Sequence, residues 1–351
     1  MERVKIAVIG CGSIANSAHI PAYRKNPGAD LTWFCDILPE RAEKAAAEYG
    51  GHFTTDYKEL LHREDIDAVS ICTPNNVHAP IAMDFLRAGK DVLCEKPAAR
   101  TYAEALEMQQ VQRETGRLLT IGVCNRFNTS VVKIKELIEA GELGDIFHVY
   151  ISFRAHRSIP GLGGAFTTKA IAGGGALIDW GVHFIDLVMF CCGDPKPLTV
   201  SGEAFSRLGR DIEGYAYKNM WAGPPIPTGI YDVEDSVTAL VRTEGPVLTV
   251  HGAWAQNIAE EAMYIDFMGD RAGIRLQYGG GFQLYTSHGK DLLTVSPDYS
   301  MDNHYEREIG SFLDSIHTRE KTAADIDNAL LTSRILQAIY DSSTSHREIV
   351  L

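Results

Sequence analysis

The sequence has few cysteines, and their number is odd. The seven cysteines show no C-x-x-C spacing and mostly lie in apolar, strand-like runs. A disulfide framework or a cysteine-based metal site depends on regularly spaced pairs. We therefore interpret the cysteines as reduced core residues, expect a cytoplasmic protein and assign no metal site.

Long hydrophobic runs are also absent. The most apolar segment, residues 176–192, is interrupted by Asp179, His183 and Asp186, whereas a membrane helix needs about 20 apolar residues. The first ten residues, MERVKIAVIG, are typical of a strand that ends at a glycine turn rather than of a signal peptide. We expect neither a membrane span nor a secretory signal.

Positive charge is in deficit. The chain has 33 Lys and Arg against 46 Asp and Glu, a formal net charge of -13, whereas nucleic-acid-binding surfaces need clustered Lys and Arg. A hydrophobic content of 45% with 23% charged residues is that of a globular protein, and 351 residues suffice for two domains. This balance favours a small-molecule ligand and no nucleic-acid partner.

Residues 1–124 alternate short β-branched runs with amphipathic helical stretches. That alternation predicts an α/β fold in which a doubly wound parallel sheet is covered by helices on both faces. We expect this part to be a nucleotide-binding Rossmann domain. The predicted strands are residues 4–9, 31–35, 68–72, 92–94 and 118–123, and the predicted helices are residues 14–25, 39–49, 77–88 and 102–115.

Residues 125–351 have a different character. A helix at 129–140, a strand at 146–153 and an apolar helix from Gly175 precede a series of strands without intervening helices. This pattern predicts a second domain with a large open, mainly antiparallel sheet. Two helices, at 304–317 and 326–342, end the chain, and the sequence leaves open whether these terminal helices pack back on the first domain.

The first strand leads into a glycine motif. In VIGCGSIAN, residues Gly10, Gly12 and Ala15 form a G-x-G-x-x-A pattern between a strand and a helix. Gly10 permits the tight turn, Gly12 leaves room for a pyrophosphate, and Ala15 allows close packing of helix and strand. The helix N-terminus then stabilises the negative charge of a dinucleotide.

An acidic residue follows at the spacing that this motif requires. Asp36 ends the second predicted strand, 21 residues after Ala15. A carboxylate at that point accepts hydrogen bonds from the adenosine ribose and repels a 2′-phosphate, which favours NAD over NADP. A turn-forming aspartate before Pro39 is the simpler explanation, and the sequence leaves both open.

Three further motifs carry a family resemblance. TPNNVH begins at Thr73 and EKP begins at Glu95, each directly after a predicted strand, and GGGALIDWGVH runs from Gly173 to His183. Together with the glycine motif, they resemble the glucose-fructose oxidoreductase / inositol dehydrogenase / MocA family over nearly the whole chain. The resemblance implies an NAD-dependent enzyme. We assign to the cofactor site Gly10, Gly12, Ser13, Ile14, Asp36, Thr73, Pro74, Asn75, His78, Glu95, Lys96 and Asn125.

The chemistry of alcohol oxidation suggests roles for three residues. If the segment from Gly175 is helical, Asp179 and His183 share one face, and a histidine has a suitable pKa to take a hydroxyl proton. Asp179 either orients that ring or holds a substrate hydroxyl. Lys96 stabilises developing alkoxide charge, as the resemblance also implies. The catalytic assignments are therefore His183, Lys96 and Asp179.

Simpler explanations exist for these residues. Asp179 and His183 alone could form a local hydrogen bond on a wet helix edge, and Lys96 could be an exposed lysine paired with Glu95. Helix capping or a core position explains His78 nearly as well as a cofactor contact. Arg154, His156 and Lys169 suit a polyhydroxylated substrate but also a solvated loop. The predicted substrate site comprises Lys96, Arg154, His156, Lys169, Asp179 and His183.

Taken together, the motifs predict an NAD-dependent oxidoreductase. It would oxidise a secondary hydroxyl of a sugar, cyclitol or glycoside, with the C3 hydroxyl of a glucoside as the favoured case. The alternatives are an NAD-dependent glycosidase without net redox change and an NAD-binding regulator without turnover. Family resemblance implies a homodimer or homotetramer formed through the C-terminal sheet, with Val237, Leu240, Val250 and Trp254 as the apolar residues of its open face.

Overall fold

The computed structural model describes residues 2–351, which form two compact units. Unit 1 contains the chain up to Phe127 together with Asp302–Leu330, and unit 2 contains Asn128–Met301 and Leu331–Leu351. The chain therefore returns to unit 1 near its end. The predicted first domain, residues 1–124, does not include this returning segment.

Unit 1 is built on a six-stranded sheet in the order β3-β2-β1-β4-β5-β6, with every neighbouring pair parallel. This is the doubly wound order, in which the strand sequence reverses between β1 and β4. The parallel sheet predicted from the alternating pattern is confirmed. Its strands are β1 Val4–Ile9, β2 Ala29–Cys35, β3 His52–Thr54, β4 Ala68–Ile71, β5 Asp91–Glu95 and β6 Leu119–Gly122.

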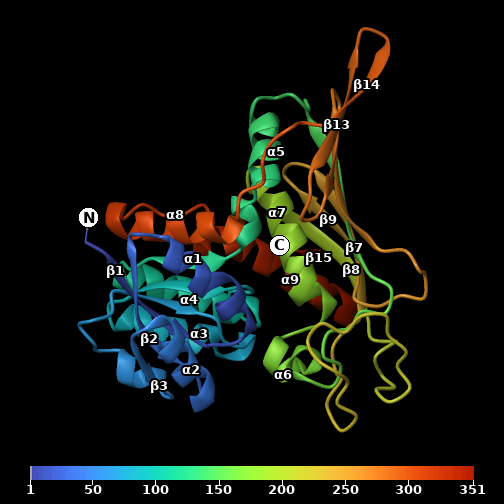
Figure 1. Ribbon diagram of the computed structural model, residues 1–351. Helices are drawn as coiled ribbons and strands as arrows, with labels where there is room; N and C mark the ends of the chain where they lie inside the picture. Colours follow the sequence, from blue (N-terminus) through green and yellow to red (C-terminus); the bar gives the residue numbers. More distant parts are fainter. Residues whose placement is uncertain (1) are drawn as a thin grey trace. The chain divides into compact units, whose positions relative to one another are not determined.

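Helices cover both faces of this sheet (Figure 1). The returning segment supplies one of them, because Ile309 and Phe312 of α8 pack in one buried cluster with Ile6 and Leu93 of the sheet. Edge strand β3 was not predicted, since two of its three residues are exposed and carry no apolar pattern. The helices are α1 Ile20–Lys25, α2 Pro39–Tyr49, α3 His78–Arg87, α4 Tyr102–Thr115 and α8 His304–Thr318.

Unit 2 contains a nine-stranded sheet in the order β14-β13-β12-β11-β7-β10-β9-β8-β15. All neighbouring pairs are antiparallel except β7 with β10, which is parallel. The mainly antiparallel sheet is thus confirmed. Its strands are β7 Ile146–Arg154, β8 Pro197–Phe205, β9 Ser236–Thr243, β10 Val247–Ala253, β11 Ala262–Gly269, β12 Gly273–Gln277, β13 Phe282–His288, β14 Asp291–Val295 and β15 Ile349–Val350.

One face of this sheet carries helices, namely α5 Thr129–Glu139, α7 Val182–Cys191 and α9 Ile326–Ser345 (Figure 1). Side chains alternate between the two faces of a strand. Val237 and Val250 therefore point into the core beneath the helices, and Trp254 is also fully buried. The expectation that these three residues form the open face is wrong, and of the four predicted only Leu240 keeps partial exposure.

One helical segment is long and apolar enough to cross a membrane by length and composition alone. This segment, Lys169–Cys191, has a mean hydropathy of 1.4 over an 18-residue window, and 83% of that window is buried inside the structure. Buried core helices of water-soluble proteins meet the same criteria. The segment is therefore weak evidence for a membrane span.

Candidate active site

The glycine turn follows β1 and precedes a helix. Gly10 has a φ of +91°, and a Cβ built there would lie 2.7 Å from the carbonyl oxygen of Cys72, so this position requires glycine. A Cβ at Gly12 would meet nothing within 4 Å. Space beside Gly12 is therefore open on the side where a phosphate would approach, as the glycine motif predicts.

A cavity of about 310 Å³ opens at this turn. Gly12, Ser13 and Asn16 line it together with the exposed cations Arg41 and Lys44 of α2. A helix N-terminus and two cations around one cavity suit an anionic ligand such as a dinucleotide pyrophosphate. Sequence analysis missed Arg41 and Lys44, although their spacing of three residues places them on one face of α2.

Asp36 lies against the same turn. One of its carboxylate oxygens accepts the N–H of Cys11 and the other accepts the N–H of Leu38, both at 2.9 Å. The residue therefore both stabilises the turn after β2 and fixes the glycine turn beside it. Each carboxylate oxygen can accept a further hydrogen bond, so this turn-forming role is compatible with ribose binding.

His78 joins the two motifs that follow β4 and β5. Its ring is fully buried, and its nitrogens lie 2.8 Å from the carbonyl oxygens of Pro97 and Thr73. Burial lowers the pKa of His78, although the two carbonyl groups act in the opposite direction. The ring holds the segments at Thr73 and Pro97 together, which differs from the cofactor contact predicted for it.

Glu95 and Lys96 end β5 at the carboxyl edge of the sheet. Glu95 is buried, and its carboxylate accepts the backbone N–H of Lys96 at 3.0 Å and contacts His19 Nε2 at 2.8 Å. Burial alone would raise the pKa of Glu95, but the hydrogen bond and charge of His19 outweigh it and lower the pKa. Glu95 therefore fixes the backbone of Lys96 through this hydrogen bond. The sequence analysis did not assign this role to Glu95, and it did not identify His19.

Three predicted cofactor residues follow neighbouring strands. Thr73 comes after β4, Lys96 directly follows β5, and Asn125 lies in a short 3₁₀ turn after β6. Asn125 is buried, whereas Lys96 keeps partial exposure. In open parallel sheets, the carboxyl edge is where ligands bind. The fold of unit 1 thus gathers these residues along one edge, together with the glycine turn.

The helix carrying Asp179 and His183 lies in unit 2 and begins just after Gly175. The buried Glu234 carboxylate accepts the N–H groups of Gly175 and Leu177 at 2.9 Å each. The hydroxyl of Tyr340 donates to the same carboxylate, also at 2.9 Å. Glu234 thus satisfies two N–H groups that a helix start otherwise leaves unpaired, and the sequence contained no signal for this distant partner.

The helix does not have the regular α geometry that the sequence predicts. Leu177–Gly181 forms a π-helix and α7 continues from Val182, and such insertions are frequent at functional sites. Asp179, within the π-helix, is buried and accepts the indole N–H of Trp254 at 3.2 Å. His183, in the first turn of α7, keeps partial exposure. The helix therefore carries one buried, fixed carboxylate and one accessible imidazole.

Asp186 is not part of this pair. It is fully buried, and one of its oxygens accepts the hydroxyl of Thr332 in α9 at 3.1 Å. This contact fixes α9 to α7 within the core. The polar residues of the apolar helix therefore serve different purposes.

The other predicted substrate residues come from other elements of unit 2. Arg154 bonds Ser152 at 3.1 Å and lies 3.8 Å from Glu260. Its alternation with the buried Phe153 puts it on the sheet face opposite α7, so the structure does not group it with Asp179. His156 follows β7 with partial exposure, and Lys169 is an exposed residue at the start of the short helix α6 Lys169–Ala172.

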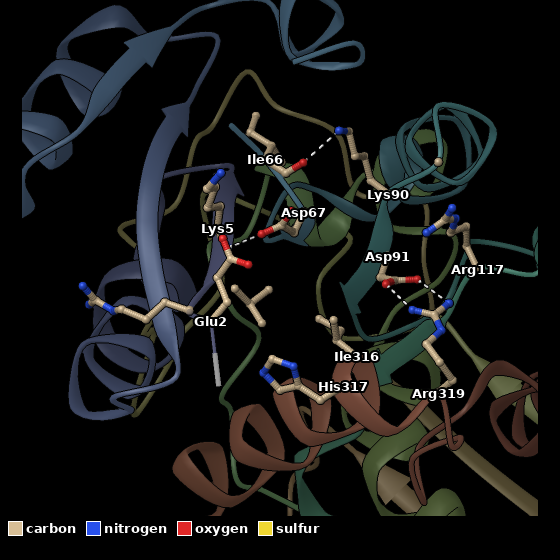
Figure 2. A pocket seen from close by; sticks show the side chains of 13 residues that line it. Glu2, Lys5, Ile66, Asp67, Lys90, Asp91, Arg117, Ile316, His317 and Arg319 are labelled. Atoms are coloured by element: carbon tan, nitrogen blue, oxygen red, sulfur yellow. Dashed lines mark hydrogen bonds and ion pairs between the residues drawn. The ribbon is translucent and has the colours of Figure 1, made fainter. Parts of the chain in front are cut away.

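A larger cavity, of about 400 Å³, lies at the opposite edge of the unit 1 sheet. Figure 2 shows Asp91 paired with Arg319 and the Asp67 carboxylate beside Lys5 in its wall. Asp67 directly precedes β4 and Asp91 begins β5, so the cavity is at the amino edge. Ligands of parallel sheets bind at the carboxyl edge, and we assign this cavity no part in catalysis. Within residues 2–351, no group of three His, Cys, Asp or Glu could hold a metal ion.

Two family models match most of the chain. Residues 4–123 match the oxidoreductase family with an NAD-binding Rossmann fold, and residues 131–275 match the GFO/IDH/MocA C-terminal domain. The chain belongs to the GFO/IDH/MocA oxidoreductase family. The motif resemblance is thereby confirmed. This GFO/IDH/MocA protein is an NAD-binding oxidoreductase, and the open space at Gly12 and the cations that line the same cavity fit that cofactor.

Similar proteins come from several bacteria. D-glucoside 3-dehydrogenase of Escherichia coli is 28% identical over 99% of this chain and 97% of its own. Levoglucosan dehydrogenase of Pseudarthrobacter phenanthrenivorans is 30% identical over 69% of this chain and 65% of its own. A solved oxidoreductase domain protein from Kribbella flavida, 24% identical, covers 100% of this chain and 99% of its own with a TM-score of 0.86. The last comparison supports the fold of this GFO/IDH/MocA protein.

Proposed function

We propose that the protein oxidises a secondary hydroxyl of a sugar-like molecule to a ketone, and that its substrate is a glucoside oxidised at C3. The observation that carries this proposal is the helix pair, in which a buried carboxylate held by Trp254 lies one turn before an accessible imidazole. The names of the relatives support the substrate class, since one is a D-glucoside 3-dehydrogenase and another a levoglucosan dehydrogenase.

In this proposal, each residue has a separate task. An imidazole nitrogen of His183 takes the hydroxyl proton, and the ammonium of Lys96 stabilises developing alkoxide charge. Asp179, fixed by Trp254, orients the His183 ring or holds a neighbouring substrate hydroxyl. When bound, NAD would supply the acceptor for the hydride of the carbinol carbon. The two electrons leave with the hydride and the proton leaves through His183, so the oxidation balances.

Binding of NAD falls to residues of unit 1. The N–H groups at the glycine turn and the cations Arg41 and Lys44 would hold the pyrophosphate, and Asp36 would accept hydrogen bonds from the ribose. The cavity at the turn and the open space at Gly12 support this assignment. Thr73, Pro74 and Asn75 follow β4 at the same edge and complete the cofactor site.

The test is NADH formation by the purified protein with NAD and a panel of glucosides, free hexoses and inositols. We expect turnover on glucosides with a 3-keto product, and loss of turnover by about 100-fold or more in His183→Ala. The matched control is His62→Ala, at an exposed histidine of unit 1.

Turnover only on inositols or free hexoses would overturn the C3 glucoside proposal. Aglycone release without accumulating NADH would replace the dehydrogenase by a redox-neutral glycosidase, and NAD binding without any turnover would indicate a regulator.

We further propose that copies associate through the open face of the nine-stranded sheet. The support is the partly exposed Tyr150 and Tyr264 on neighbouring strands, with ring centroids 5.9 Å apart, beside the ion pair of Arg275 and Asp266. Aromatic residues and arginine are enriched at such interfaces. Light scattering should give a dimer or tetramer for the native chain and a smaller species for Tyr150→Glu. A monomeric native protein would refute this assembly.

A further inference from the structure

We propose that His19 is a positioning residue for Lys96, acting through the carboxylate of Glu95. The proposal rests on the catalytic role of Lys96 proposed above. His19 belongs to no motif that the chemistry uses, yet it lies nine residues after Gly10 in a π-helix, Ala15–His19, that directly follows the glycine turn. It is a polar side chain without exposure in the centre of unit 1.

The contacts form a continuous chain from His19 to Lys96. His19 Nδ1 lies 2.8 Å from Ser70 Oγ, and His19 Nε2 lies 2.8 Å from one oxygen of Glu95. The other Glu95 oxygen accepts the backbone N–H of Lys96 at 3.0 Å. The position of the carboxylate is therefore set on one side by His19, and it sets the backbone of Lys96 on the other.

Packing leaves the Glu95 carboxylate little freedom to move. Gly122 of the neighbouring strand β6 lies against it, and a Cβ built on Gly122 would approach the carboxyl carbon of Glu95 to 3.2 Å. A side chain held this tightly, with both oxygens engaged, transmits the position of one partner to the other. Removing His19 would leave a buried carboxylate without its main partner, which costs far more than losing an exposed contact.

The other buried groups near Glu95 do not replace the positive charge of His19. The titratable groups that face this cluster are Tyr23 of α1, Cys72 after β4, His78 of α3, Cys94 of β5, Cys124 after β6, and Tyr305 and Glu308 of α8. All of them are acids except His78, whose pKa is lowered by burial, and burial raises the pKa of Glu308 well above its usual value. Only His19 and Lys96 contribute positive charge that lowers the pKa of Glu95.

The variants His19→Ala and His19→Gln test this proposal, with His62→Gln as the matched control. We expect kcat to fall about 10-fold or more in His19→Ala, with the dissociation constant of NADH within about twofold of the native value. His19→Gln should recover part of the activity, because a carboxamide can still donate to Glu95. Without the cation, the pKa of Glu95 rises, so the acidic limb of the kcat profile should move to higher pH in His19→Gln.

Hydrogen exchange gives a readout that does not depend on turnover. In His19→Ala, the amide of Lys96 should exchange about 10-fold or more faster than in the native protein, while peptides from β2 and α2 stay unchanged. Unchanged exchange at Lys96, or equally faster exchange throughout unit 1, would overturn the positioning role. Because this arm needs no substrate, it decides the inference even if the proposed reaction fails.

Discussion

Trp254 donates its indole N–H to the carboxylate of Asp179 at 3.2 Å, although the two residues are 75 positions apart in the chain. Trp254 follows β10 and is itself fixed, because its backbone N–H donates to the carbonyl of Asp235 at 2.8 Å. Both side chains are buried. The orientation of the carboxylate before His183 is therefore set by the sheet as well as by its own helix.

Trp254→Phe should weaken catalysis more than folding. Phenylalanine keeps most of the apolar contact but removes the N–H, which leaves Asp179 short of a donor in a buried position. We expect kcat/KM for the alcohol substrate to fall by about 10-fold to 100-fold, which corresponds to about 1.5–3 kcal/mol for a hydrogen bond to a charged group. Steady-state kinetics and thermal unfolding of the variant measure the two effects.

Trp180→Phe is the matched control for this substitution, because Trp180 lies in the same π-helix and packs in the same apolar cluster. Equal losses of kcat/KM in both variants would show that ring packing, not the hydrogen bond to Asp179, limits catalysis.

The two glycines of the turn should respond differently to alanine. At Gly12, a Cβ meets nothing within 4 Å, so Gly12→Ala should keep the native melting temperature but weaken NAD binding by about 10-fold or more, because the methyl group occupies the approach of the pyrophosphate. At Gly10, the Cβ would lie 2.7 Å from the Cys72 carbonyl at positive φ, so Gly10→Ala should lower the melting temperature. NADH fluorescence titration and calorimetry separate the two outcomes. Normal NAD affinity in folded Gly12→Ala would contradict this account of the turn.

The sequence predicts those parts of the fold whose signals are local. The strand and helix around Gly10, the helices Pro39–Tyr49 and Tyr102–Thr115, and most strands of both sheets follow from apolar periodicity and turn residues. The edge strands β3, β14 and β15 do not, because strands without a buried face have no alternating pattern to detect.

The site shows the same limit. Motifs point to Lys96, Asp179 and His183 as candidates, but several of the residues that hold them come from elsewhere in the chain. Glu234 and Trp254 reach the helix of Asp179 across tens of residues, and no spacing rule connects them. The π-helix is likewise invisible to a pattern of 3.6 residues per turn, since it changes hydrogen bonding without changing the apolar composition.

Glu308 should make the protein less stable as the pH rises, whereas most carboxylates have the opposite effect on the pH dependence of stability. It is fully buried, neither of its oxygens has a hydrogen-bond partner among residues 2–351, and burial raises its pKa well above the usual value. The folded protein thus holds a proton that the unfolded chain releases near pH 4.3. Its stabilising contribution is complete below that pH and is lost as pH rises toward the folded pKa.

Glu308→Gln carries no such proton. Relative to the native chain, the variant should therefore gain about 1.4 kcal/mol in the free energy of unfolding for each pH unit above about 4.3, until the pH reaches the folded pKa of Glu308. Urea unfolding at pH 5, 6 and 7 measures this difference. Exposed Glu320, in the same unit, is the control position, and its Gln variant should show no trend. A difference that stays constant with pH would mean that Glu308 is ionised in the folded protein.

Glu234 should be needed both for the helix start and for the reaction. In Glu234→Gln, one oxygen is replaced by an NH₂ group that faces the N–H of Gly175 or Leu177, so a donor meets a donor in a buried position. We expect the free energy of unfolding to fall by about 1–3 kcal/mol and kcat to fall with it, because the displaced helix carries Asp179. Tyr340→Phe, which removes only the third donor to the same carboxylate, should cost less in both measurements. If Glu234→Gln lost stability but kept full kcat, the helix start would not control the position of Asp179. The hydrogen bond from the indole N–H of Trp254 would then have to hold Asp179.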